Sequence, residues 1–443
     1  MLCTRVDADG LLCRVDRAAG SEWRWADSLR PDPIAELFFA AAVSSIKLEY
    51  SASRGRCVIA EKALRRGALL LSCPALVLIL DGGNNDGAKW CAQLFGRLGF
   101  DEPTAALALS ALADDGTRRI VRALTRNAEP LIAPGLRDKL RPFLPSSLLN
   151  SIDDAELQDL FVAVKENLHR VLDAETASRP IGLGLFPAAC LLNHDCQPNA
   201  CLSFANNGRT LHIRAISDIA AGDEVACSYL AEEQLYAAWE ERSALLRTAF
   251  HFEPIEPKER HAAEQAAQQT PVSEATRKRV MAAIAEAQRS AASGGEAAEA
   301  ATATLLELIT TNLEPSVHPF HPLVQEAHVA LLALGRTLDE PQLIAKAALH
   351  LLTAREATLP VGTLHLASLY AAHAGAIGKL IKQGEVPPTE RKQAAAAVAG
   401  SMRAAERIRV SCLGAEHPLA AATTAARLRA EENAPDPHTR FQQ

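Results

Sequence analysis

The chain has 443 residues, of which 48% are hydrophobic and 22% are charged, so it can bury a large core and is expected to form two or three domains. Its 46 basic and 53 acidic residues are dispersed, and the formal net charge of -7 argues against direct nucleic-acid binding. No apolar run is long enough to span a bilayer and the first ten residues include charges, so we expect an intracellular protein, cytoplasmic or nuclear, without membrane contact. We also expect a monomer.

The first part of the chain predicts a short helix and then a β meander. The helix is expected over Ile34–Val43. Ile46–Tyr50 alternates apolar and charged residues, as a half-buried strand does. Further strands are expected over Cys57–Ala60 and over Ala68–Leu80, the latter broken by Pro74.

A helical region then interrupts the strands. The stretch 81–87, rich in glycine and asparagine, is expected to end the meander. From Trp90 to about Val171 the spacing of leucine, alanine and valine is helical, with prolines dividing the segments.

Strand character returns beyond Ala200. Leu202–Phe204 and Leu211–Arg214 flank an Asn-Gly pair at 207–208, which is a strong hairpin signal, and a last strand is expected over Glu224–Tyr229. The sequence therefore predicts an α+β fold in which a β-rich domain is split by a helical insert.

Helical patterns continue from Glu232 onward. Ser290–Ala303 has few bulky residues and is expected to be exposed or loosely packed. Stacked helix pairs of the tetratricopeptide (TPR) kind would bury the apolar faces of the helices that follow, and so would a plain bundle; both architectures remain open. These amphipathic helices are expected at Leu323–Leu338, Gln342–Arg355, Gly362–Ile381, Thr389–Val410 and Pro418–Glu431.

The ten cysteines are better explained as small core residues than as metal ligands. Cys190, Cys196, Cys201 and Cys227 lie close together in the sequence, but no two of them form the C-x-x-C pair from which zinc sites are usually built. We therefore expect free thiols in a reducing compartment and no bound metal.

The polar run Asn193–Asn199 (Asn-His-Asp-Cys-Gln-Pro-Asn) follows directly after the apolar Ala188–Leu192. Taken alone, it has two interpretations. It is a capped turn, because Asn and Asp side chains bond to nearby backbone and Pro fixes the exit, or it belongs to a functional site.

Several blocks together with this run resemble the SET domain, and within it the SET and MYND domain (SMYD) lysine methyltransferases. Gly182–Asn199 is similar to that family's G-x-G-L-[FY]-P…L-L-N-H-S-C-x-P-N, with Asp195 in place of Ser. The remaining blocks occur in the family's order and spacing, and the resemblance covers residues 46–252 and, loosely, the helical C-terminal region. These blocks are Arg54–Ala60 with Gly67, Ala215–Ile219, Gly222–Val225, Ser228–Leu230 and the later Leu413–Pro418.

The resemblance implies an S-adenosylmethionine-dependent protein-lysine methyltransferase with a protein or peptide substrate. It implies Tyr229 as the catalytic residue, with its hydroxyl facing the methyl group and the amine, and Phe250 and Phe252 as walls of the substrate channel. The residues implied for cofactor binding are Gly55, Arg56, Asn167, Asn193 and His194.

Four departures from the family pattern bear on these expectations. Cys57 replaces the second glycine of the N-terminal loop, and Phe250 stands where the family has a second pocket tyrosine. The cysteines of the MYND finger and those after the SET core are missing. A SET-like scaffold with impaired catalysis that acts through its helical C-terminal domain is therefore the alternative, and methylation of another acceptor such as histidine is a third.

The predicted division of the chain has six parts. They are an N-terminal extension (1–45), the first part of the SET domain (46–80), the helical insert (81–160), the second part of the SET domain (161–252), a helical linker (253–300) and a TPR-like α-helical domain (301–443).

Overall fold

The chain forms two compact units in the computed structural model. The β-rich unit comprises residues 1–230 and 243–255, and the helical unit comprises residues 231–242 and 256–443. No helix in the described part of the chain is long and apolar enough to cross a membrane. The structure describes residues 2–6, 12–16, 24–25, 33–51, 54–80, 115–124, 135–141, 144–173, 175–177, 179–254, 266–267, 270–313, 317–359 and 361–432.

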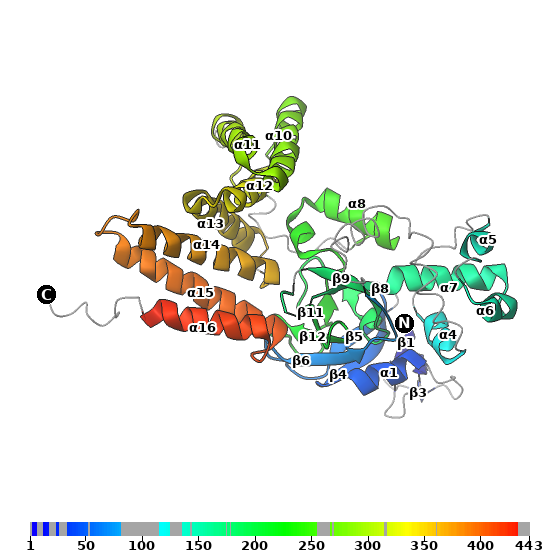
Figure 1. The fold of residues 1–443 in the computed structure, drawn as a ribbon. Helices are drawn as coiled ribbons and strands as arrows, with labels where there is room; N and C mark the ends of the chain where they lie inside the picture. Colours follow the sequence, from blue (N-terminus) through cyan, green and yellow to red (C-terminus); the bar gives the residue numbers. More distant parts are fainter. Residues whose placement is uncertain are drawn as a thin grey trace. The chain divides into compact units, whose positions relative to one another are not determined.

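The β-rich unit contains several small sheets rather than one large one (Figure 1). β4 pairs with β5, β12 lies between β11 and β6, β9 lies between β7 and β8, and β10 pairs in parallel with β13. Their bounds are Ile46–Ser51 (β4), Gly55–Ala60 (β5), Leu69–Pro74 (β6), Val77–Leu80 (β7), Leu168–Leu172 (β8), Pro180–Leu185 (β9), Asn193–His194 (β10), Ala200–Ala205 (β11), Thr210–Ala215 (β12) and Ala226–Cys227 (β13).

Strands from before and after the helical insert share sheets. Leu71 of β6 is paired with Ile213 of β12, and Val77 of β7 with Leu185 of β9. The predicted α+β fold, with a β-rich domain interrupted by helices, is therefore confirmed. The described α-helices of this unit are α1 (Pro33–Ala41), α4 (Asp115–Arg122), α5 (Leu136–Leu140), α6 (Ser146–Ser151) and α7 (Asp154–Asn167). Helix α8 (Trp239–Phe250) begins in the helical unit and ends in the β-rich unit.

The predicted helical region, from Trp90 to about Val171, extends too far at its C-terminal end. Helix α7 stops at Asn167, and residues 168–172 form β8 on the edge of β9. Tertiary pairing with β9 decides the conformation here, which periodicity along the chain cannot show. Three short strands near the N-terminus, β1 (Leu2–Val6), β2 (Leu12–Asp16) and β3 (Arg24–Trp25), were also not anticipated. The predicted turn at 81–87 and the beginning of the helical region lie outside the described residues.

The hairpin predicted from the Asn-Gly pair is present. β11 and β12 are antiparallel, and Ala205 faces Thr210 across the turn. Asn206, Asn207 and Gly208 all have positive φ, a conformation that asparagine and glycine tolerate better than other residues.

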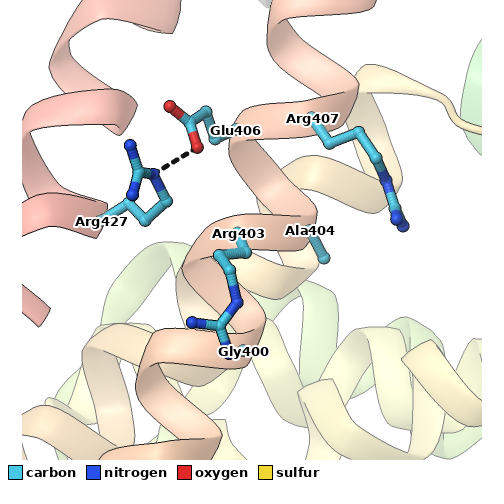
Figure 2. Close-up of a pocket in the computed structure, with 6 residues that line it drawn as sticks. All are labelled: Gly400, Arg403, Ala404, Glu406, Arg407 and Arg427. Carbon is cyan, nitrogen blue, oxygen red and sulfur yellow. Dashed lines mark ion pairs between the residues drawn. The ribbon is translucent and has the colours of Figure 1, made fainter. Parts of the chain in front are cut away.

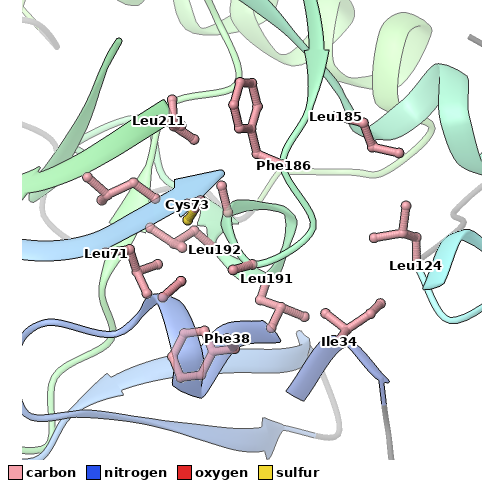
Figure 3. Close-up of a cluster of buried hydrophobic side chains, with 14 of the residues drawn as sticks. Ile34, Phe38, Leu71, Cys73, Leu124, Leu185, Phe186, Leu191, Leu192 and Leu211 are labelled. Atoms are coloured by element: carbon pink, nitrogen blue, oxygen red, sulfur yellow. The ribbon is translucent and has the colours of Figure 1, made fainter. Parts of the chain in front are cut away.

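The apolar residues in front of the polar run fix it to the core (Figure 3). Phe186, Leu191 and Leu192 are almost completely buried, in one cluster with Phe38 of α1 and Leu211 of β12. Each such side chain contributes about 1.5–3 kcal/mol through burial. The polar run therefore begins directly after residues that are anchored in the core.

The helical unit is an array in which helices α12 to α16 each pack against the next one in the sequence (Figure 1). A pattern of neighbour contacts is typical of stacked repeats. The segment 290–303, predicted to be exposed or loosely packed, is exposed at most of its positions, and Ser290, Ala298 and Ala301 are the residues that it buries. The bounds are Glu274–Ser293 (α10), Gly295–Leu308 (α11), Pro322–Leu338 (α12), Pro341–Thr358 (α13), Leu364–Gln383 (α14), Arg391–Leu413 (α15) and Pro418–Glu432 (α16).

We expect acid to destabilise the helical unit through His328. Its ring stacks on that of His350, with centroids 3.7 Å apart, and burial together with His350 lowers the pKa of His328 to about 3. The unfolded state, with a pKa near 6.5, then binds more protons below that pH. Stability is complete at higher pH and is lost as the pH falls from 6.5 toward 3, by about 1.4 kcal/mol at pH 5.5.

Calorimetry of the full chain at pH 7.5 and 5.5 tests this expectation. The variant His328→Phe keeps a stacked ring that cannot titrate. Between the two pH values its Tm should therefore fall by about 3–6 °C less than the Tm of the wild type. An equal fall in both proteins would show that His328 is not responsible.

Candidate functional site

The polar run Asn193–Asn199 lies alongside the later segment 224–229. Asn193 and His194 pair in parallel with Ala226 and Cys227 as β10 and β13. On the other side of that segment, Val225 donates its N–H to the carbonyl oxygen of Val58 in β5 at 2.7 Å. Residues far apart in the sequence are thus placed side by side.

The ring of His194 holds Tyr229. Its Nδ1 accepts a hydrogen bond from the backbone N–H of Tyr229 at 3.0 Å. Because Nδ1 is the acceptor, the proton of the neutral ring lies on Nε2, which faces the Sγ of Cys196 at 3.2 Å. His194 is buried, so it acts as a fixed support beneath Tyr229.

Tyr229 directs its hydroxyl toward the residue that precedes the polar run. The hydroxyl donates to the carbonyl oxygen of Leu192 at 2.8 Å, and burial raises the pKa of Tyr229 above its ordinary value of 10. The phenol therefore stays protonated at neutral pH. Since its proton is committed to Leu192, the oxygen is left as an acceptor toward any further partner.

Aromatic rings surround this tyrosine. The centroid of Tyr229 lies 5.1 Å from that of Phe250, 6.2 Å from that of Phe252 and 5.4 Å from that of His194. Phe250 and Phe252 are both half-buried. The structure therefore brings the predicted catalytic residue and both predicted channel residues into one cluster.

Asn193 lies against the loop that opens β5. Its Nδ2 donates to the carbonyl oxygen of Arg56 at 2.9 Å and lies 3.4 Å from the Sγ of Cys57. Within the described part of the chain, no hydrogen bond is formed by its Oδ1, which is left to accept from a ligand. Gly55 has a φ of 70°, and a Cβ added to it would meet nothing within 4 Å, so there is open space beside it.

Two predicted cofactor residues are placed differently from the others. The guanidinium of Arg56 donates to the carbonyl oxygen of Ala123 at 2.6 Å, so Arg56 offers the site its backbone carbonyl. The side-chain amide of Asn167 donates to the carbonyl oxygen of Ala163, one helical turn earlier, at 2.8 Å. The backbone carbonyl oxygen of Asn167 lies 3.5 Å from the Sγ of Cys190. Their roles toward a cofactor stay predictions.

Sequence reasoning missed Arg54 and Glu224 as site residues. They form an ion pair with 2.9 Å between Nη1 and Oε2, next to Asn193. Both residues stand within recognisable blocks of the sequence. No spacing rule, however, pairs two charges that lie so far apart along the chain.

Several thiols of the β-rich unit are buried in its core. Burial raises the pKa of both Cys73 and Cys227 to about 12, so they behave as small core residues. Among the described residues, no group of three or more His, Cys, Asp or Glu side chains could hold a metal ion.

A separate cavity of about 490 Å³ lies in the helical unit, between α15 and α16 (Figure 2). Arg403 and Arg427 line it, but both are ion-paired with Glu431, and Arg427 also pairs with Glu406. The charges of these two arginines are therefore largely compensated, and Arg407 also lines the cavity. None of the predicted site residues contributes to it.

Comparison with known proteins identifies the class of the β-rich unit. Residues 55–230 match the family model described as the SET domain, so this part of the chain is a SET domain. The chain is similar to histone-lysine N-methyltransferase SMYD3 of Homo sapiens, with 37% identity over 98 residues, 22% of this chain and 21% of that protein. It is also similar to histone-lysine N-methyltransferase ASHR1 of Arabidopsis thaliana, with 36% identity over 80 residues, 18% of this chain and 16% of that protein.

The resemblance inferred from the motif blocks is therefore confirmed. The matched segments span only 16–21% of the length of these relatives. Among solved structures, the SET domain of LSMT bound to lysine and AdoHcy matches with 12% identity and a TM-score of 0.30, over 90% of this chain and 93% of that one.

Proposed function

We propose that the chain is an S-adenosylmethionine-dependent protein-lysine methyltransferase. The observation that carries this proposal is the cluster in which Tyr229, fixed by His194 and Leu192, is surrounded by Phe250 and Phe252. The similarity of the SET domain to lysine methyltransferases supports the same chemistry. The substrate is proposed to be a lysine side chain of a protein or peptide.

The residues around Gly55 and Asn193 fit the cofactor. S-adenosylmethionine supplies an activated methyl group and carries an ammonium and an exocyclic amine, both of which need hydrogen-bond acceptors. Asn193 offers its Oδ1, because its amide nitrogen is committed to Arg56 and Glu224. The open space beside Gly55 accommodates a ligand close to the backbone.

Tyr229 is proposed to orient the acceptor amine. Its hydroxyl oxygen, polarised by donation to Leu192, accepts a hydrogen bond from the amine and directs the nitrogen lone pair toward the methyl group. The same oxygen makes weak contacts with the methyl hydrogens. Because the phenol stays protonated, Tyr229 acts by position and dipole and not as a base.

The phenylalanines favour the neutral form of the substrate. A lysine ammonium loses hydration between Phe250 and Phe252, which lowers its pKa and releases the lone pair needed for displacement. The rings also exclude water from the methyl group.

Label transfer tests the proposal. The purified chain is incubated with S-adenosylmethionine carrying a labelled methyl group and a cell extract, and labelled proteins are hydrolysed for amino-acid analysis. We expect methyl-lysine. Methyl-histidine would assign another acceptor, whereas cofactor binding without any transfer would favour the alternative of a SET-like binding scaffold, which the loss of the second pocket tyrosine supports.

We expect Phe250→Tyr to speed the first methyl transfer up to about tenfold and to reduce higher methylation, because a second hydroxyl would bond the amine and fill space beside Tyr229. Mass spectrometry of the substrate over time measures both effects. Phe39→Tyr, in α1, is the matched control and should change neither. Unchanged rate and product in Phe250→Tyr would mean that position 250 does not face the amine.

A further inference from the structure

The carboxylate of Glu224 joins three parts of the candidate site. Its Oε1 accepts from the Nδ2 of Asn193 at 2.8 Å, and its Oε2 is ion-paired with the Nη1 of Arg54 at 2.9 Å. The second guanidinium nitrogen of Arg54 donates to the carbonyl oxygen of His194 at 2.9 Å. Glu224 thus bonds Asn193 of β10 directly and is connected to His194, the other residue of β10, through Arg54.

The backbone that carries this carboxylate is itself held firmly. The side-chain amide of Asn199 donates to the carbonyl oxygen of Glu224 at 2.7 Å and accepts from the N–H of Ala226 at 2.9 Å. The Glu224 side chain is 18% exposed, so its bonds lie largely out of water, where charge-assisted hydrogen bonds are strongest.

We propose that Glu224 is a positioning residue for cofactor binding: it fixes the amide of Asn193 and the guanidinium of Arg54, and so presents the Asn193 Oδ1 to the ligand. This inference rests on the proposed function. Glu224 acts through Asn193, since its two oxygens are both committed within the protein.

The variant Glu224→Gln isolates this role. It keeps the size of the side chain but replaces one oxygen by an NH2 group, which cannot accept a hydrogen bond. Whichever way the amide turns, either Asn193 or Arg54 then faces a donor. Because the backbone clamp made by Asn199 is unchanged, we expect the fold to survive.

Cofactor binding and turnover are measured separately. We expect the Kd of S-adenosylmethionine, measured by calorimetry, to rise about tenfold, together with its KM, while kcat at saturating cofactor changes less than about threefold. A purely structural loss would lower the active fraction and hence kcat. Asp138→Asn, which neutralises an exposed carboxylate paired with Arg141 in the same unit, is the control and should bind normally.

Hydrogen exchange without cofactor supplies a second readout. We expect faster exchange in Glu224→Gln confined to residues 54–60 and 192–196. A wild-type chain that binds no S-adenosylmethionine refutes the proposed function, and the exchange data still decide whether Glu224 holds these segments. If the variant binds like wild type, or exchange rises throughout the β-rich unit, the inference is overturned.

Discussion

Replacing Tyr229 by phenylalanine should lower methyl transfer by about 100- to 1,000-fold, the loss found when one oriented polar group is removed from an active site. The substitution deletes the hydroxyl that donates to Leu192 and keeps the ring against Phe250 and Phe252. Because the backbone N–H of Tyr229 still bonds His194, we expect the fold to be unchanged. The Kd of S-adenosylmethionine should stay within about threefold of the wild-type value.

Initial rates with labelled cofactor, together with calorimetric binding, measure this result. Tyr236→Phe is the matched control, because that hydroxyl is buried against Thr363 in the helical unit. It should leave transfer unchanged at temperatures where the variant is folded. Full activity in Tyr229→Phe would remove the catalytic role assigned to the hydroxyl and with it the proposed mechanism.

His194→Ala should affect both stability and activity. It leaves the N–H of Tyr229 without its acceptor and opens a cavity where a buried ring stood, which together cost about 2–4 kcal/mol of the free energy of unfolding of the β-rich unit. Transfer should fall at least about 100-fold in the molecules that remain folded, because Tyr229 is no longer fixed in place.

Thermal unfolding of the full chain and rates corrected for the folded fraction separate the two effects. His373→Ala is the control: His373 is buried within the helical unit, where its Nδ1 pairs with the Oγ of Ser401 at 2.9 Å. It should lower stability while sparing transfer per folded molecule. Equal specific activities of the two variants would show that His194 serves only the core.

The architecture was predictable where local chemistry decides it. The Asn-Gly turn predicts its own hairpin, and the apolar period of α12 to α16 predicts helices within a few residues of their observed bounds. Residues 168–172 were misassigned because pairing with β9 overrides their local preference. The six-part division of the chain stays a prediction.

The candidate site was likewise predictable only in part. Asn193, His194 and Tyr229 could be singled out from motif order, and the structure brings them together. Arg54 and Glu224 could not be paired, because the ion pair between them exists only once distant segments meet. The backbone carbonyl oxygen of Arg56 accepts a hydrogen bond from Asn193, and such a backbone contact does not depend on residue type, so the sequence could not predict it.

The position of segment 224–229 between the polar run and β5 has a consequence for folding kinetics. Two of the bonds that build the site span 140 and 137 positions of sequence, between Arg54 and His194 and between Arg56 and Asn193. Closing such long loops is entropically costly and slow. The site should therefore assemble late, after the local hairpins β4–β5 and β11–β12 have formed, and folding intermediates should hold these hairpins while still unable to bind a cofactor.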